Sequence, residues 1–123
     1  MSNREQLRSN FALDRINSRN KIDKELANFI VSTPTLIMTN GLGQTFAYLK
    51  SKGKRDANEK HNIVAEAIRL WCENCKPGIG SNENQFIKGL NGLNQTDYLT
   101  LQEEVLKMLQ WLKRYARAFQ EGG

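Results

Sequence analysis

Residues 100–119 read TLQEEVLKMLQWLKRYARAF and carry the most regular apolar spacing in the chain. The apolar positions step by four, three, four, three and four residues: Leu101, Val105, Met108, Leu112, Tyr115 and Phe119. Such steps place one apolar stripe along a helix. Thr100 and Glu103 have the spacing of a capping box, which predicts that the helix begins there. The stripe covers only about two to three heptads, so it predicts a face that packs within a bundle and not a free-standing coiled coil.

Helical spacing recurs upstream, and no segment shows the sustained alternation of a strand. A possible capping box of Ser2 and Glu5 predicts a helix from about residue 3, and a phase change in the apolar stripe predicts a break at residues 18–20. Thr33-Pro34 resembles a cap followed by proline at the first helical position. This pair predicts a helix that contains Gly41 and Gly43 and ends at Gly53.

Further capping and turn residues divide the rest of the chain. Asp56 with Glu59 predicts the start of another helix, which Pro77-Gly78 ends. A short helix with apolar residues at 86, 87, 90 and 93 follows, and Asn94 closes it. The expected fold is all-α, a compact bundle of five or six helices, with residues 1–123 as a single helical domain.

Composition limits the classes of function. The chain has 123 residues, 39% of them apolar and 25% charged, which is ordinary for one globular domain. No run approaches the roughly 18 apolar residues of a membrane span, and no apolar core follows the basic N-terminus. We therefore expect a soluble, cytoplasmic protein with no membrane partner. The net charge of +5 favours a polyanionic partner, nucleic acid first.

Three groups of basic residues stand out: Arg15, Arg19, Lys21 and Lys24 surround the predicted break, and the other two are clusters that we expect at helix ends. We call them the turn cluster and the C-terminal cluster. Cations near a helix C-terminus also interact favourably with the helix dipole, so charge alone leaves a solvated face and a phosphate-binding surface both open. The candidate RNA-binding residues are Lys50, Lys52, Lys54 and Arg55 of the turn cluster, and Lys113, Arg114 and Arg117 of the C-terminal cluster.

The reactive residue types do not assemble into a catalytic motif. Cys72 and Cys75 form a C-x-x-C pair, but the chain has one histidine, His61, and no second cysteine pair to complete a zinc site. The pair also falls at a helix C-terminus, where the dipole disfavours a thiolate. We expect two reduced thiols near the core, no metal ion, no cofactor and no enzymatic activity. A redox protein that uses this pair remains the enzymatic alternative.

The segment Asn40-Gly41-Leu42-Gly43-Gln44-Thr45 is the second candidate site. It lacks the Gly-Lys-Thr of a phosphate loop and the third glycine and preceding strand of a dinucleotide site. Two glycines in one helical turn indicate close packing instead. We expect Asn40, Gly41, Gly43 and Gln44 to serve packing or subunit contact.

Two extended motifs resemble one known family. The first runs Pro34-Thr35-Leu36-Ile37, then Asn40 to Thr45, then Phe46-Ala47-Tyr48-Leu49 with Lys52 after it. The second has Thr100, Glu103 and then Trp111-Leu112-Lys113-Arg114-Tyr115-Ala116-Arg117-Ala118. In order and separation they are similar to the small helical subunit of the Cmr complex, the type III-B CRISPR RNA-guided effector. The resemblance covers nearly the whole chain, whereas the C-x-x-C and the asparagine-rich loop after Gly80 match nothing functional in that family.

The resemblance implies a non-catalytic subunit that acts in antiviral defence. Copies stack along the filament of the backbone subunit and contact the large polymerase-like subunit at one end. Their basic faces help bind the target RNA paired with the guide RNA, while base pairing supplies the sequence specificity. The alternative is a purely structural helical adaptor that makes no direct contact with RNA.

Overall fold

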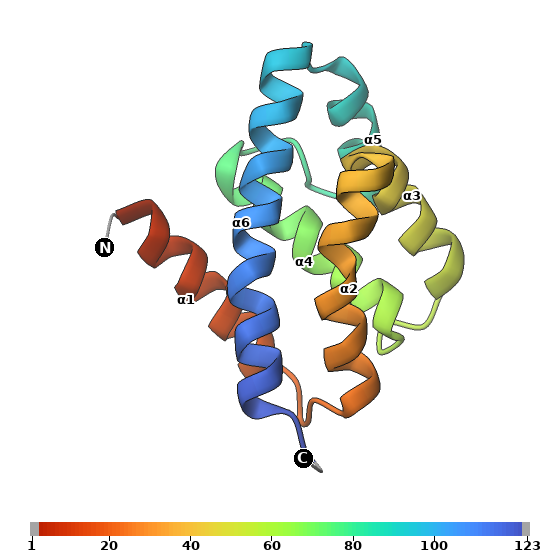
Figure 1. Ribbon diagram of the computed structural model, residues 1–123. Coiled ribbons are helices and arrows are strands. Elements are labelled where there is room, and N and C mark those ends of the chain that lie inside the picture. The colour runs from red at the N-terminus through yellow and green to blue at the C-terminus, as the bar shows by residue number, and fades with distance from the viewer. Residues whose placement is uncertain (1–2, 122–123) are drawn as a thin grey trace. The chain divides into compact units, whose positions relative to one another are not determined.

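The computed structural model describes residues 3–121, and this range is helical with no named strand (Figure 1). It confirms the prediction of an all-α fold with five or six helices. The helices are α1 (Asn3–Asn17), α2 (Lys24–Asn40), α3 (Leu42–Gly53), α4 (Lys60–Cys75), α5 (Glu83–Gly92) and α6 (Gln95–Phe119). In this range no helix is long and apolar enough to cross a membrane.

The chain divides into two compact units, and α2 and α6 each contribute residues to both. The first unit contains residues 3–35 and 106–121 of the described range. Its buried residues include Ile16, Ile22 and Ile30 from the N-terminal segments and Met108 and Leu112 from α6. The backbone N–H of Glu121 donates to the carbonyl of Ile22 at 2.8 Å, which ties the end of α6 to the link between α1 and α2.

The second unit contains residues 36–105, and within it α3 packs against α4 and α5. Phe46 of α3 meets Phe86 of α5 edge to face, with ring centroids 4.8 Å apart. Trp71 of α4 is 1% exposed, and its indole N–H donates to the carbonyl of Glu104 at 3.2 Å. These large buried side chains form the centre of this unit.

The apolar stripe of residues 101–119 is buried along most of its length. Leu101, Val105, Met108 and Leu112 lie in the core, as predicted. The last two members differ, because Tyr115 is half-buried and Phe119 is exposed. The predicted start at Thr100 is wrong: α6 begins at Gln95, and the Thr100 hydroxyl donates to the carbonyl of Thr96 within the helix. The Asn94 side chain accepts from the N–H of Asp97, so Asn94 opens α6 and does not close α5.

The predicted break at residues 18–20 is confirmed, since α1 ends at Asn17 and α2 begins at Lys24. The Ser2 part of the predicted first cap lies outside the described residues. The predicted helix start at Thr33-Pro34 is wrong because α2 runs through Pro34 to Asn40. The Thr33 hydroxyl donates to the carbonyl of Phe29 and not to a following N–H, so it does not cap a helix.

The chain breaks instead at Gly41, which separates α2 from α3 with a φ of 85°. Glycine adopts this conformation without the strain that a Cβ would cause. Gly41 is therefore a helix boundary and Gly43 lies in the first turn of α3, whereas the sequence pattern predicted both within one helix. Two predicted helix ends are confirmed: α3 ends at Gly53, and α4 ends at Cys75, before Pro77-Gly78.

Candidate nucleic-acid interface

The turn cluster lies where α3 ends and the chain turns into α4. Gly53 is buried at the end of α3, and Lys54 follows with a φ of 53°. The Lys54 N–H donates to the carbonyl of Lys50 at 3.2 Å, which closes the last turn of the helix. The side chains of Lys52, Lys54 and Arg55 are exposed, so this turn presents three cations to solvent.

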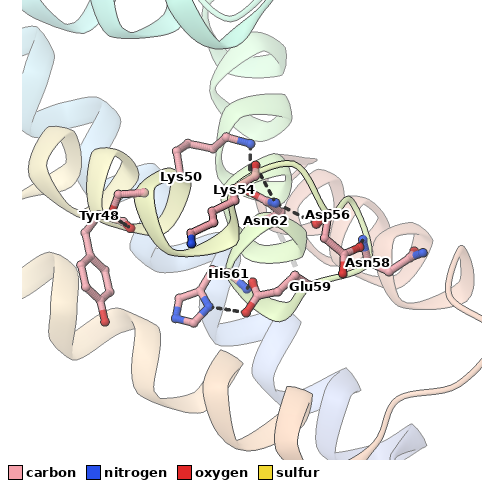
Figure 2. A network of polar contacts seen from close by, with 9 residues as sticks. Tyr48, Lys50, Lys54, Asp56, Asn58, Glu59, His61 and Asn62 are labelled. Carbon is pink, nitrogen blue, oxygen red and sulfur yellow. Dashed lines mark hydrogen bonds and ion pairs between the residues drawn. The ribbon is translucent and has the colours of Figure 1, made fainter.

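The side chain of Asn62, on α4, holds the turn through hydrogen bonds (Figure 2). It is 6% exposed, and its amide nitrogen donates to the carbonyls of Asp56 and Lys54 at 2.7 and 3.3 Å. Its oxygen accepts from the amino group of Lys50 at 2.9 Å. One buried amide therefore satisfies two loop carbonyls and positions one lysine, which makes the turn a rigid base for its cations.

Lys50 differs from the other three members of the cluster. Its side chain is 25% exposed, and its amino group lies 2.9 Å from a carboxylate oxygen of Glu83 at the start of α5. With Asn62 and Glu83 as partners, Lys50 joins three segments of the second unit. Its charge is already partly compensated within the protein, so it is the least suited of the four to bind a phosphate.

The turn ends at Glu59, which caps α4. The Asp56–Glu59 capping box is wrong, because the helix begins at Lys60 and Asp56 accepts from the N–H of Asn58 instead. The Glu59 carboxylate accepts from the backbone N–H of His61 at 2.5 Å and from its ring Nδ1 at 2.6 Å. Burial alone would raise the pKa of Glu59, but the hydrogen bonds from His61 outweigh it and the pKa of Glu59 is lowered.

The lowered pKa predicts how pH changes stability through Glu59. A carboxyl that binds its proton less readily in the folded state stabilises the fold above its unfolded pKa, about 4.3, and this contribution is lost as pH falls through the folded pKa. Glu59→Gln keeps an acceptor for the His61 N–H but removes the charge. Urea unfolding from pH 7 to pH 3 should show lower stability than the wild type at pH 7 and a smaller difference at pH 3.

The control for this measurement is Glu121→Gln, which removes an exposed carboxylate at the other end of the chain. Its stability curve should run parallel to that of the wild type through the acid range. If the Glu59→Gln and wild-type curves are also parallel, the charge of Glu59 does not stabilise the cap.

A pocket of about 420 Å³ opens beside the turn. Its apolar part consists of the buried Phe46 and Ala65 and the exposed Ala57, and Asn62 and charged side chains form the rest. The charged lining consists of four cations and two carboxylates: Lys50, Lys54, Arg55 and Arg69, with Glu66 and Glu83. Arg69 is held in place because its guanidinium donates to the carbonyl of Gly80 at 2.5 Å.

The C-terminal cluster lies on the part of α6 that belongs to the first unit. Arg114 and Arg117 are exposed and Lys113 is half-buried. Aromatic rings run along the same helix, with Trp111 stacked on Tyr115 at a centroid distance of 5.8 Å. These rings are anchored to α1, since Trp111 donates to Glu5 at 2.6 Å and the hydroxyls of Tyr115 and Ser9 lie 2.6 Å apart. Trp111 and Tyr115 therefore pack within the first unit.

The glycine segment is occupied by contacts from α6. The N–H of Leu42 donates to the side-chain oxygen of Gln102 at 2.8 Å, and the N–H of Gly43 donates to the hydroxyl of Tyr98 at 2.8 Å. A Cβ at Gly43 would lie 3.4 Å from that hydroxyl. The first N–H groups of α3 are thus engaged inside the protein. A Cβ at Gly41 or Gly43 would make only an ordinary contact with Tyr98, so the predicted close packing does not require glycine here, whereas the positive φ of Gly41 does. The side chains of Asn40 and Gln44 are exposed, where they are open to a partner subunit.

The two cysteines are thiols with no disulfide between them. Cys72 is buried in α4, and burial, with a smaller effect of Cys75, raises the pKa of Cys72 well above its ordinary value. Cys75 is half-buried. Among residues 3–121, no group of three or more His, Cys, Asp or Glu side chains is arranged to hold a metal ion.

The burial of Cys72 predicts unequal reactivity of the two thiols. Titration of the native protein with a thiol reagent at neutral pH should modify Cys75 first, because the Cys72 thiol is both inaccessible and protonated. Cys72 should react only when the protein unfolds. In Cys75→Ser the fast phase should disappear, and a fast phase that persists would contradict the burial of Cys72.

Comparison with protein-family models gives a match over residues 4–119, to the CRISPR-associated protein family Cas_Cmr5. The match covers nearly the whole chain. The chain belongs to this family. It is therefore a small subunit of the type III-B CRISPR Cmr complex, alongside the other subunits of that complex. The resemblance that the two sequence motifs indicated is confirmed.

Three residues of the interface were missed by sequence reasoning: Asn62, Arg69 and Glu83. Each contributes through a contact to a segment at least six residues away along the chain. Only Asn62 could have been identified from the sequence, because a polar residue next to the apolar stripe of α4 is a candidate for a buried hydrogen-bonding group.

Proposed function

We propose that this Cmr small subunit is a non-catalytic RNA-binding subunit that helps hold the target RNA paired with the guide RNA. Copies would stack along the backbone-subunit filament and reach the large polymerase-like subunit, as part of cytoplasmic antiviral defence. The turn cluster and the C-terminal cluster would contact backbone phosphates, and base pairing would supply sequence specificity.

The observation that carries the proposal is the turn cluster on its rigid base. Lys52, Lys54 and Arg55 are exposed on a turn whose carbonyls are held by a buried asparagine. A turn whose backbone is held before binding loses less conformational entropy when a phosphate arrives. Lys52 also lies over the ring of Tyr48, 5.9 Å from its centroid, and this tyrosine is 42% exposed. An exposed ring beside a cation suits stacking on an unpaired base.

Asn40, Gly41, Gly43 and Gln44 are proposed to serve subunit contact or packing. The two glycines lie against Tyr98, and Asn40 and Gln44 face solvent. Contact with another subunit would therefore involve the two polar side chains, while Gly41 provides the positive φ at the boundary between α2 and α3.

The test measures how tightly the assembled complex binds target RNA as salt increases. Lys54→Ala with Arg55→Ala should weaken binding and reduce the salt slope by about 0.7–0.9 for each phosphate that the variant no longer neutralises. Lys113→Ala with Arg114→Ala should act in the same direction. Lys76→Ala with Lys88→Ala is the matched control, because it removes two exposed charges outside both clusters and should leave the slope unchanged.

The result also separates RNA binding from the adaptor alternative. If the complex assembles and both cluster variants bind RNA with unchanged affinity and slope, the subunit acts as a structural adaptor and the RNA-binding proposal is wrong. Subunit composition of each purified variant complex, measured by native mass spectrometry, shows that assembly is intact.

A further inference from the structure

We propose that the pocket beside the turn cluster binds a phosphomonoester, the group found at a phosphorylated RNA end or on a nucleoside monophosphate. The pocket shares Lys54 and Arg55 with the turn cluster, so the RNA-end form of this inference rests on the proposed function. Four features support this: the size of the pocket, its charge, the oriented guanidinium of Arg69 and the presence of carboxylates in the lining.

The size of the pocket suits a phosphate together with part of the group that carries it. A volume of about 420 Å³ falls within the range of roughly 300–1,000 Å³ usual for small-molecule pockets. The whole lining belongs to the second unit, from α3, the turn, α4 and the first residue of α5. Ala57, an exposed residue of the turn, offers a small apolar surface for the group that carries the phosphate.

The charge of the lining matches a dianion. Four cations face two carboxylates, which leaves two positive charges. The Lys50–Glu83 pair is neutral as a unit, so the surplus of the lining comes from Lys54, Arg55 and Arg69 against Glu66. Glu73, outside the lining, offsets part of the charge of Arg69. A phosphomonoester carries about −1.5 to −2 at pH 7, whereas an internal backbone phosphate carries a single negative charge. A terminal phosphate therefore compensates the pocket more completely.

One donor of the lining, Arg69, is in place without a ligand. Arg69 is oriented by its bond to the Gly80 carbonyl, and that bond uses one of the five N–H groups of the guanidinium. A guanidinium can bind two phosphate oxygens at once. On the opposite segment of the lining, Asn62 holds the backbone carbonyl of Lys54, whose side chain is exposed.

The carboxylates of the pocket favour the end of an RNA chain over its middle. An internal phosphate brings a charged phosphate on each side to a lining that includes Glu66 and Glu83. Like charges at short range repel. An end has neighbours on one side only, so it enters with less repulsion.

The test compares one short single-stranded RNA with a 5′-phosphate, with a 3′-phosphate or with hydroxyls at both ends, bound to the isolated full-length chain. Adenosine monophosphate and inorganic phosphate serve as competitors. One of the phosphorylated RNAs should bind at least about tenfold more tightly than the hydroxyl form. Arg69→Gln should abolish this preference and leave the affinity for the hydroxyl form unchanged.

Arg55→Gln is the second variant, because Arg55 is exposed and its replacement leaves the Arg69–Gly80 bond in place. It should reduce the same preference even if Arg69→Gln fails to fold. Lys88→Gln, an exposed site on α5 outside the lining, should retain the full preference.

The competitors distinguish the two sources of the group. Preference for a phosphorylated end without displacement by adenosine monophosphate assigns the pocket to RNA ends, and displacement at similar concentrations assigns it to nucleotides. Binding of adenosine monophosphate without RNA binding supports the nucleotide form of the inference and overturns its RNA-end form, while the proposed function is decided separately by the salt dependence of the assembled complex. Equal affinity for all three RNAs with no effect of either competitor overturns the pocket and leaves the proposed function standing.

Discussion

Phe46→Ala should lower the free energy of unfolding by about 3–5 kcal/mol, the usual cost of emptying a buried phenylalanine site. Phe46 is 1% exposed and meets Phe86 edge to face at 4.8 Å. The substitution removes buried apolar area, leaves a cavity and eliminates the aromatic pair, which adds about 0.5–1.5 kcal/mol beyond burial. Urea unfolding followed by circular dichroism measures the decrease.

Phe119→Ala is the matched control, since it makes the same change at a ring that is 53% exposed. Its cost should stay below about 1 kcal/mol because little area leaves the core. A double-mutant cycle with Phe86→Ala isolates the energy of the ring pair. Equal destabilisation by Phe46→Ala and Phe119→Ala would contradict the burial of Phe46.

Gly53→Ala should destabilise the protein by about 1–3 kcal/mol through overpacking, although alanine is the better helix former. A Cβ at this position would overlap the side-chain amide of Asn62. Asn62 is held by the carbonyls of Lys54 and Asp56 and by Lys50, so it moves away only by breaking those bonds. Thermal and urea unfolding both measure the change.

Gly92→Ala provides the comparison, because Gly92 ends α5 and a Cβ there meets nothing within 4 Å. It should be neutral or stabilising by up to about 1 kcal/mol. In an Asn62→Ala background, the cost of Gly53→Ala should shrink because the clash is gone. Full additivity of the two substitutions would show that Asn62 is not the obstacle.

Apolar spacing predicted the helices better than local caps did. The stripe along residues 101–112 is buried as expected because periodicity averages over many residues. Caps rest on one or two residues, and the same pairs occur inside helices. Thr33-Pro34 was misleading for this reason: α2 continues through the proline, and the chain breaks at Gly41, where a positive φ is required.

The candidate interface was predictable in its charge but not in its construction. Runs of lysine and arginine are visible in the sequence, and the turn cluster is where the pattern placed it. The partial compensation of the Lys50 charge depends on Asn62 and Glu83, which come from two other helices. Local sequence carries no information about such distant partners. The role of the seven basic residues in RNA binding stays a prediction.

The hydrogen bonds at the start of α3 bear on how the chain is made. The N–H groups of Leu42 and Gly43 find their acceptors on Gln102 and Tyr98, which are 60 and 55 residues further along the chain. A ribosome releases α3 well before either acceptor exists. Until α6 emerges, water must occupy those donors, so the nascent helix is left with a frayed beginning. Completion of α3 is thereby delayed until nearly all of the protein has been translated.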